Sequence, residues 1–124
     1  MRRKITGYIK NITTSEITKI NTSAIQNKEK ITFNFMDAIN IIKLKEKEIE
    51  LTRKNKDVQT KMIFIENTIT LAKVTMLETK STHYLQIKTT ISYVSNDTIN
   101  IFYKIIEAKE EYELKLILGR NLWV

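Results

Sequence analysis

Cysteine and proline are absent from the sequence of 124 residues, and the only glycines are Gly7 and Gly119. Without cysteine the chain has no disulfide scaffold, no cysteine-ligated zinc site and no thiol nucleophile. Two glycines are too few for the glycine-rich loops that bind phosphate groups. The same scarcity argues against a flexible linker, and the length is typical of one domain. We therefore expect a single domain over residues 1–124, with tails at 1–3 and 119–124.

Residues suited to catalysis or to metal binding are also few. His83 is the only histidine, which excludes a site built from several histidines. Each of the three aspartates, Asp37, Asp57 and Asp97, falls in a predicted turn, where its side chain would cap the turn. The sequence contains no Gly-x-Ser-x-Gly nucleophile motif. We therefore expect a protein that is not an enzyme and that has no metal or cofactor.

Long apolar runs are missing as well. No window approaches the ~18 apolar residues of a membrane-spanning helix, and no apolar segment follows the basic start at residues 1–4 as it would in a signal peptide. We therefore expect a cytoplasmic protein without a membrane span.

The charge is strongly positive. Lysine and arginine number 21 against 14 acidic residues, for a net charge of +7 at pH 7. A charge of this sign attracts nucleic acid and anionic surfaces. The lysines are dispersed along the chain, however, and a high content of Lys, Ile and Asn also follows from an AT-rich genome. Charge alone therefore favours no particular partner.

Most of the chain alternates apolar and polar residues with the period of a β-strand, and isoleucine and threonine are abundant, as suits a pleated surface. Strands are predicted over 4–12, 16–27, 31–36, 39–44, 47–53, 58–65, 68–76, 82–94, 99–105 and 112–118. The alternation breaks near Asn21, which predicts a bend or bulge there. A turn is predicted at Asp37-Ala38. In 82–94 one face should carry His83, Leu85, Ile87, Thr89, Ile91 and Tyr93.

Two segments are ambiguous. Residues 36–54 and 104–118 are rich in Glu, Lys and Leu or Ile, and their helix propensity is high. Their period-2 alternation and the surrounding strands favour β-structure instead. Residue pattern alone leaves helix and strand as alternatives for both.

The stretch 49–65 organises the middle of the chain as two strands joined by a charged turn at residues 54–57. Ile49, Leu51 and Arg53 share one face of the first strand. Val58, Thr60, Met62 and Phe64 share one face of the second. A terminal pair of strands follows over residues 99–118.

This arrangement resembles the YwiB-like family of small bacterial proteins, specifically at Leu51-Thr52-Arg53, at Met62-Ile63-Phe64 and over 99–118. The family has a calycin-like antiparallel β-barrel and no established biochemical role. The resemblance implies an all-β fold, a single antiparallel calycin/lipocalin-like barrel of about 8–10 strands. It also implies strands for 36–54 and 104–118.

The chain departs from the family pattern at two places. Lys54-Asn55 stands where the family usually has a glycine after the arginine, and asparagine can adopt the left-handed conformation that such a turn needs. Residues 71–78 stand where the family tends to have an aromatic, glycine-containing stretch.

Arg53 is the most informative single residue, because it lies in phase with Ile49 and Leu51, which should face the core. An unpaired guanidinium is very costly to bury, so Arg53 must lie at a barrel end or be paired. Two interpretations follow: it seals one end of a solid core, as arginines often do in calycin barrels, or it binds an anion at the mouth of a cavity.

The hypothesis with most support is a non-catalytic barrel that binds a small apolar or amphipathic molecule. Its ligand-binding residues would be Arg53, Phe33, Phe35, Phe64, His83 and Tyr103, although the aromatic residues also suit a plain core. An enclosed apolar void above ~300 Å³ would be expected.

The alternative is a basic nucleic-acid- or RNA-associated binding module. Such a module needs exposed aromatic residues within a basic sheet face, and Tyr8, Tyr84 and Phe102 fall on the outward phase of their strands. The chain is expected to be a monomer or a homodimer, since unpaired strand edges can pair between subunits. The apolar tail Leu122-Trp123-Val124 could dock on the barrel or on a neighbour.

Overall fold

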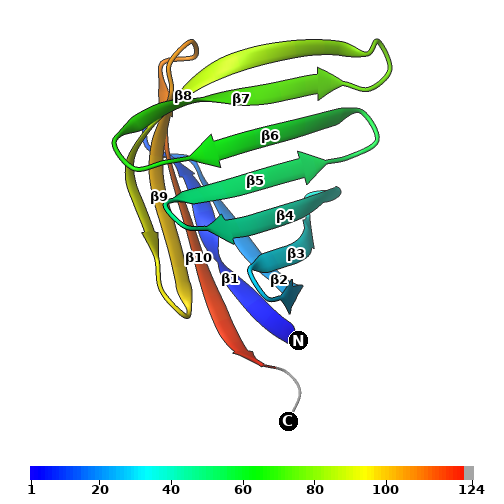
Figure 1. Ribbon diagram of the computed structural model, residues 1–124, viewed down its shortest axis with the longest axis vertical. Coiled ribbons are helices and arrows are strands. Elements are labelled where there is room, and N and C mark those ends of the chain that lie inside the picture. Colours follow the sequence, from blue (N-terminus) through cyan, green and yellow to red (C-terminus); the bar gives the residue numbers. More distant parts are fainter. Residues whose placement is uncertain (122–124) are drawn as a thin grey trace.

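The computed structural model describes the chain over residues 1–121, with side chains through Gly119 (Figure 1). The described part forms ten strands and no helix. They are β1 (Arg2–Asn11), β2 (Ile17–Asn27), β3 (Lys30–Phe35), β4 (Ala38–Lys45), β5 (Glu48–Lys54), β6 (Val58–Phe64), β7 (Thr68–Met76), β8 (Ser81–Val94), β9 (Thr98–Ile105) and β10 (Glu110–Asn121).

Each strand pairs antiparallel with the next one along the chain, and β10 pairs with β1, so the sheet closes into a barrel. The predicted all-β, antiparallel barrel is confirmed. Both ambiguous segments are β-structure: 36–54 forms β4 and β5, and 104–118 spans the end of β9 and most of β10. Alternate residues of these strands are buried in the barrel, and this burial outweighs their intrinsic helix propensity.

The barrel is flattened rather than round. In Figure 1 strands β4 to β7 run steeply across β8, β9, β10 and β1. Strand pairing is shortest at two places in the barrel. β2 pairs with β3 only over Ala24–Asn27, and β6 pairs with β7 only over Val58–Lys61. At each place a threonine side chain replaces part of the ladder. Thr22 donates to the carbonyl of Asn34, and Thr70 donates to that of Ile63.

Because the strands alternate in direction, the connections gather at two ends of the barrel. We call one the Arg53 end; it holds the β1–β2, β3–β4, β5–β6, β7–β8 and β9–β10 connections. We call the other the Arg3 end; it holds the remaining connections and the two strand ends at Arg2 and Asn121. The two arginines therefore lie at opposite ends.

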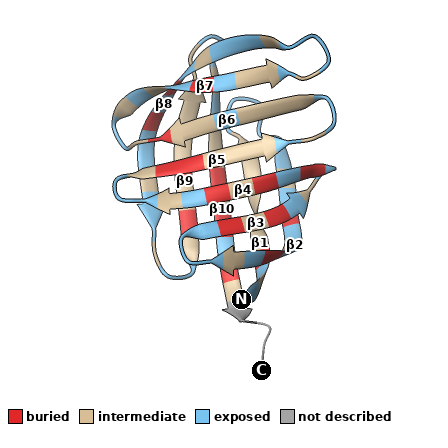
Figure 2. Cartoon of the chain, turned by 45° about the vertical axis from the view of Figure 1, so that its right-hand side comes forward, coloured by how far each residue is buried: buried red, intermediate tan, exposed pale blue. Residues whose placement is uncertain are grey.

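The core consists of alternate, inward-facing residues from all ten strands. Figure 2 shows buried residues along β3, β4 and β5. The buried apolar side chains are Ile5, Ile20, Ala24, Ile31, Phe33, Ala38, Ile42, Ile49, Phe64, Ala72, Ile87, Ile99, Ile101, Leu114, Leu116 and Leu118. They comprise only two aromatic rings, so the interior is mainly aliphatic.

Three local predictions were wrong. Strand β2 runs without a register shift past Asn21, and it does so because Ile17 and Ile25 face solvent instead of the core. The turn between β3 and β4 lies at Met36-Asp37, one residue earlier than predicted. Residues 2–3 and 119–121, which were expected to lie in tails, belong to strands, since β1 begins at Arg2 and β10 ends at Asn121. Leu122-Trp123-Val124 lies outside the described residues.

Strand β8 corrects a fourth prediction. Leu85, Ile87 and Thr89 face inward as expected, but the β8–β9 register shifts between Thr89 and Ile91. The extra residue of this bulge moves the following side chains to the opposite face. Ile91 and Tyr93 are therefore exposed, at 47% and 55%, and do not share the face of Ile87.

Turns in this chain use left-handed residues other than glycine. Positive φ angles occur at Ser15, Lys28, Met36, Asp37, Lys47, Asn67, Lys80 and Lys109. Side chains with a Cβ adopt this region at a cost, and asparagine or glycine tolerates it better. The scarcity of glycine therefore did not remove the tight hairpins; it made them less stable.

The β3–β4 turn offers a test of this cost. Met36 (φ 51°) and Asp37 (φ 56°) both have positive φ, as in a type I′ turn, which prefers Asn-Gly. We expect Met36→Asn with Asp37→Gly to stabilise the fold by about 1 kcal/mol in urea unfolding. Asp97→Gly, in the β8–β9 turn where φ is not positive, should destabilise it. Equal effects at both turns would contradict the interpretation.

Candidate functional site

A polar row crosses the inner wall at the Arg53 end. Strand register places Arg53 of β5 directly opposite Asn40 of β4 and Thr60 of β6, and it continues through Val74 of β7 to His83 of β8. Arg53 and His83 are separated by three interstrand spacings, roughly 14 Å. They are therefore at the same level of the barrel but are not in contact.

The row beneath it is apolar and incompletely covered. Leu51 and Met62 lie opposite each other, and Leu85 lies opposite Ala72 on the neighbouring pair of strands. Leu51, Met62 and Leu85 pack against the core but remain only partly buried. The inner wall at this end thus presents a polar rim above a partly accessible apolar surface.

Arg53 is partly buried and lacks a protein partner. Among the residues whose side chains are described, none forms a hydrogen bond or a salt bridge with its guanidinium. Its five N–H groups are therefore available to water or to an anion. The first interpretation of Arg53, that it bonds backbone carbonyls and seals the barrel, is not what the structure shows.

Arg3 has that sealing role at the opposite end. Its Nε donates to the carbonyl of Gly119 at 2.8 Å and its Nη2 to that of Leu118 at 3.2 Å. Its Nη1 donates to Gln26 Oε1 at 2.9 Å and to the carbonyl of Asn96 at 3.4 Å. Arg3 was not among the predicted site residues, because residues 1–3 were expected to form a tail. The signal was present, since Arg3 lies in phase with the inward-facing Ile5.

An aromatic stack lies inside the barrel below the Arg53 end. The ring of Tyr103 lies 4.9 Å from that of Phe64 and 5.4 Å from that of Tyr112, between ring centroids. Burial raises the pKa of Tyr103, and the neighbouring Tyr112 raises it further. Burial also raises the pKa of Tyr112, whose hydroxyl donates to Glu110 Oε2 at 3.0 Å. Both phenols are therefore neutral hydrogen-bonding groups at neutral pH.

The six predicted ligand-binding residues fall into three groups. Phe33 and Phe64 are buried, 6% and 0% exposed, and serve the core. Phe35 and Tyr103 are partly buried and pack against it, and Arg53 is partly buried at the rim. His83 is exposed. The structure thus brings Phe64 and Tyr103 into contact and leaves His83 apart from both.

A wide pocket lies on the rim of the Arg53 end. It has a volume of about 670 Å³, is open to solvent, and lies between the β3–β4 and β5–β6 turns. Its lining includes Phe35, Met36 and Ile39 together with Lys54 and Lys56. Apolar side chains beside lysines suit a molecule with an apolar body and an anionic group.

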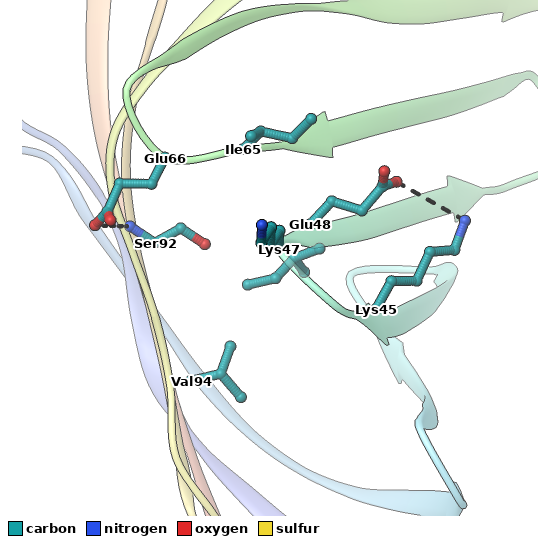
Figure 3. Close-up of a pocket in the computed structure, with 8 residues that line it drawn as sticks. Lys45, Lys47, Glu48, Ile65, Glu66, Ser92 and Val94 are labelled. Atoms are coloured by element: carbon teal, nitrogen blue, oxygen red, sulfur yellow. Dashed lines mark hydrogen bonds and ion pairs between the residues drawn. The ribbon is translucent and has the colours of Figure 1, made fainter.

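A second pocket, of about 400 Å³, lies at the Arg3 end where β8 extends beyond β7 (Figure 3). Glu66 reaches across the opening and accepts a hydrogen bond from the backbone N–H of Ser92 at 3.4 Å. Lys45 and Glu48, on its other side, form an ion pair of 3.8 Å. The polar groups that line this pocket are thus largely engaged with one another.

One acidic residue is buried on the outside of the barrel. Glu50, on the outer face of β5, is 5% exposed, and its carboxylate lies 2.9 Å from Lys45 Nζ and 3.0 Å from Lys61 Nζ. The hydrogen bond from Lys45 and that from Lys61 lower the pKa of Glu50 despite its burial. Glu50 is therefore an ionised, structural carboxylate.

Thr89 carries a hydroxyl that has no described hydrogen-bond partner although the residue is fully buried. A buried hydroxyl without a partner costs free energy relative to a methyl group of the same shape. We expect Thr89→Val to stabilise the barrel by about 1 kcal/mol in urea unfolding. Thr89→Ser, which keeps the hydroxyl and loses the methyl, should destabilise it; a stabilising Thr89→Ser would contradict this account.

The described part of the chain lacks two other kinds of feature, a metal-binding cluster and a membrane-spanning helix. There, no three His, Asp or Glu side chains come together as a metal site would require. Nor does this part of the chain contain a helix that could cross a membrane.

Comparisons with known proteins show the fold and nothing finer. No family model matches the chain. No curated protein matches it either. Among solved structures, the crystal structure of the ywiB protein from Bacillus subtilis matches with a TM-score of 0.65 and 15% sequence identity, over 97% of this chain and 90% of that one. The barrel is thus similar to that of YwiB.

Proposed function

We propose that this protein is a non-catalytic binder of a small amphipathic anion, held at the Arg53 end of the barrel. The observation that carries the proposal is the contrast between two inward-facing arginines. Arg3 is bonded to four groups of its own protein, whereas Arg53 has no described partner. Because an unpaired, partly buried guanidinium is costly, an anionic ligand that pairs with Arg53 would gain that energy on binding.

The surroundings of Arg53 match the remainder of such a ligand. Below the polar rim, Leu51, Met62 and Leu85 offer partly accessible apolar surface. All the pockets described above are open rather than enclosed. The ligand would therefore lie across the mouth, with part of its surface in water, instead of inside the sealed void expected from sequence.

A fluorescent carboxylate such as dansylaminoundecanoic acid tests the proposal directly. We expect it to bind the wild-type protein, and we expect Arg53→Gln to weaken binding at least about tenfold, since one charge-assisted interaction is lost. The methyl ester of the same probe, which lacks the anionic group, should bind both proteins equally.

Lys43→Gln provides a matched control. It removes one positive charge from the outer face of β4, next to the strand of Arg53, and Lys43 forms no described salt bridge. Its affinity for the probe should equal that of the wild type. Equal losses in Lys43→Gln and Arg53→Gln, or an unchanged affinity in Arg53→Gln, would overturn the proposal.

A further inference from the structure

The outer face of β8 and β9 carries three rungs of cross-strand neighbours. The bulge after Thr89 turns Ile91 and Tyr93 outward, so the rungs are Lys88 with Lys104, Ile91 with Phe102, and Tyr93 with Asn100. We call these six residues the lysine–aromatic face. Lys88, Ile91 and Tyr93 are exposed, and the others are partly buried. Nothing in the described chain covers them, because they point away from the barrel.

The two lysines face each other without neutralisation. Directly opposed side chains on an antiparallel pair lie ~5 Å apart at Cβ, and like charges there are destabilising. Neither Lys88 nor Lys104 forms a salt bridge with a carboxylate of the described residues. Glu111 lies opposite Lys104 without pairing with it. A groove of about 190 Å³ is lined by Lys88, Lys104, Thr90 and Phe102, and also by Glu111. An anion in this groove would relieve the repulsion.

The next two rungs provide flat apolar surface. Tyr93 lies diagonal to Phe102 on the adjacent strand, close enough for the two rings to form one contact surface. Aromatic rings on a basic sheet face stack against nucleobases, while lysines contact the phosphates. Of the two acids beside this surface, Glu113 accepts a hydrogen bond from Asn100 at 3.0 Å, and Glu111 lies opposite Lys104.

From this arrangement we infer that the lysine–aromatic face binds single-stranded nucleic acid, with bases on Tyr93 and Phe102 and phosphates on Lys88 and Lys104. The net charge of +7 supports the sign of the partner. A second copy of the chain fits less well, because a two-fold contact through this face would place the lysines of one copy near those of the other. The inference is independent of the ligand proposed at the Arg53 end.

Fluorescence anisotropy with a labelled oligonucleotide of about 20 thymidines at about 50 mM salt tests the inference. Lys88→Gln with Lys104→Gln should weaken binding about tenfold and reduce the slope of log affinity against log salt by about 1.4. Lys30 and Lys43 form the same kind of opposed pair on β3 and β4. Their double glutamine variant has the same net charge and should change the affinity less than about twofold.

Variants of Tyr93 distinguish the contribution of base stacking from that of charge. Tyr93→Ala should weaken binding about tenfold, whereas Tyr93→Phe keeps the ring and should bind like the wild type. Far-UV circular dichroism confirms that each variant is folded. Absence of binding by the wild type, equal losses in the two lysine pairs, or binding only to vesicles that contain phosphatidylserine would each overturn the inference.

Discussion

Gly7→Ala is expected to destabilise the barrel by about 4 kcal/mol, a large share of the stability of a domain of this size. Gly7 has a φ of 153°, which side chains with a Cβ rarely adopt. A Cβ built on it would also lie 1.9 Å from the carbonyl oxygen of Lys115 on β10. That oxygen belongs to the backbone of the strand that closes the barrel, so it cannot move aside without opening the β1–β10 ladder.

Gly119→Ala is the matched control for Gly7→Ala. Gly119 has no positive φ, and a Cβ there would meet the carbonyl oxygen of Lys4 at 3.1 Å. A shift of a few tenths of an ångström accommodates that contact, so we expect a loss below about 1 kcal/mol. Urea unfolding followed by circular dichroism measures both. Similar losses in the two variants would show that the close approach at Gly7 is not the cause.

Arg3→Gln is expected to destabilise the protein by about 2–3 kcal/mol, the second-largest effect predicted here. Glutamine cannot reach the carbonyls of Leu118 and Gly119 and the side chain of Gln26 at once. The substitution therefore leaves partly buried acceptors without donors at the Arg3 end. Thermal and urea unfolding should both show the loss.

Arg53→Gln distinguishes the two arginines. It removes the same charge, but no described hydrogen bond or salt bridge, so the free energy of unfolding should change by less than about 0.5 kcal/mol. Binding of the anionic probe should be the property that changes. If Arg53→Gln lowers the free energy of unfolding as much as Arg3→Gln does, Arg53 is a structural residue and the proposed binding site at Arg53 is contradicted.

Arg3 and Arg53 show what the alternation of the sequence can predict and what it cannot. Period-2 alternation correctly placed Arg53 on an inward face, and it would have placed Arg3 there too had the first strand been started two residues earlier. Alternation reports which face a side chain occupies. Alternation does not show whether a carbonyl of a distant strand accepts a hydrogen bond from that side chain, as the carbonyl of Gly119 does from Arg3.

Strand β8 shows a different limit. Residues 82–94 alternate so regularly that one continuous face was predicted, yet the bulge after Thr89 reverses it. No glycine or proline marks the position. The bulge is favoured by pairing with β9, which buries Ile99 and Ile101. The bulge exposes Ile91, and this exposure creates the lysine–aromatic face. The pattern of the sequence therefore placed Phe102 outward but missed Ile91 and Tyr93, which complete the surface for which we infer a macromolecular partner.

By itself, the sequence determined that the chain is cysteine-free, basic and rich in strands, and it located most of them, because alternation and β-branched residues act within a single strand. For 36–54 and 104–118 the residue pattern left helix and strand open, and the barrel decided for strand. The tertiary structure alone decided which residues are neighbours: barrel closure by β1 and β10, the sealing of one end by Arg3, and at the other end a guanidinium of Arg53 that pairs with no described side chain. Those features depend on hydrogen bonds between residues far apart in the chain, which no local period encodes. The scarcity of glycine left lysines in left-handed turns, and of the two glycines Gly7 is the one at which a side chain has no room.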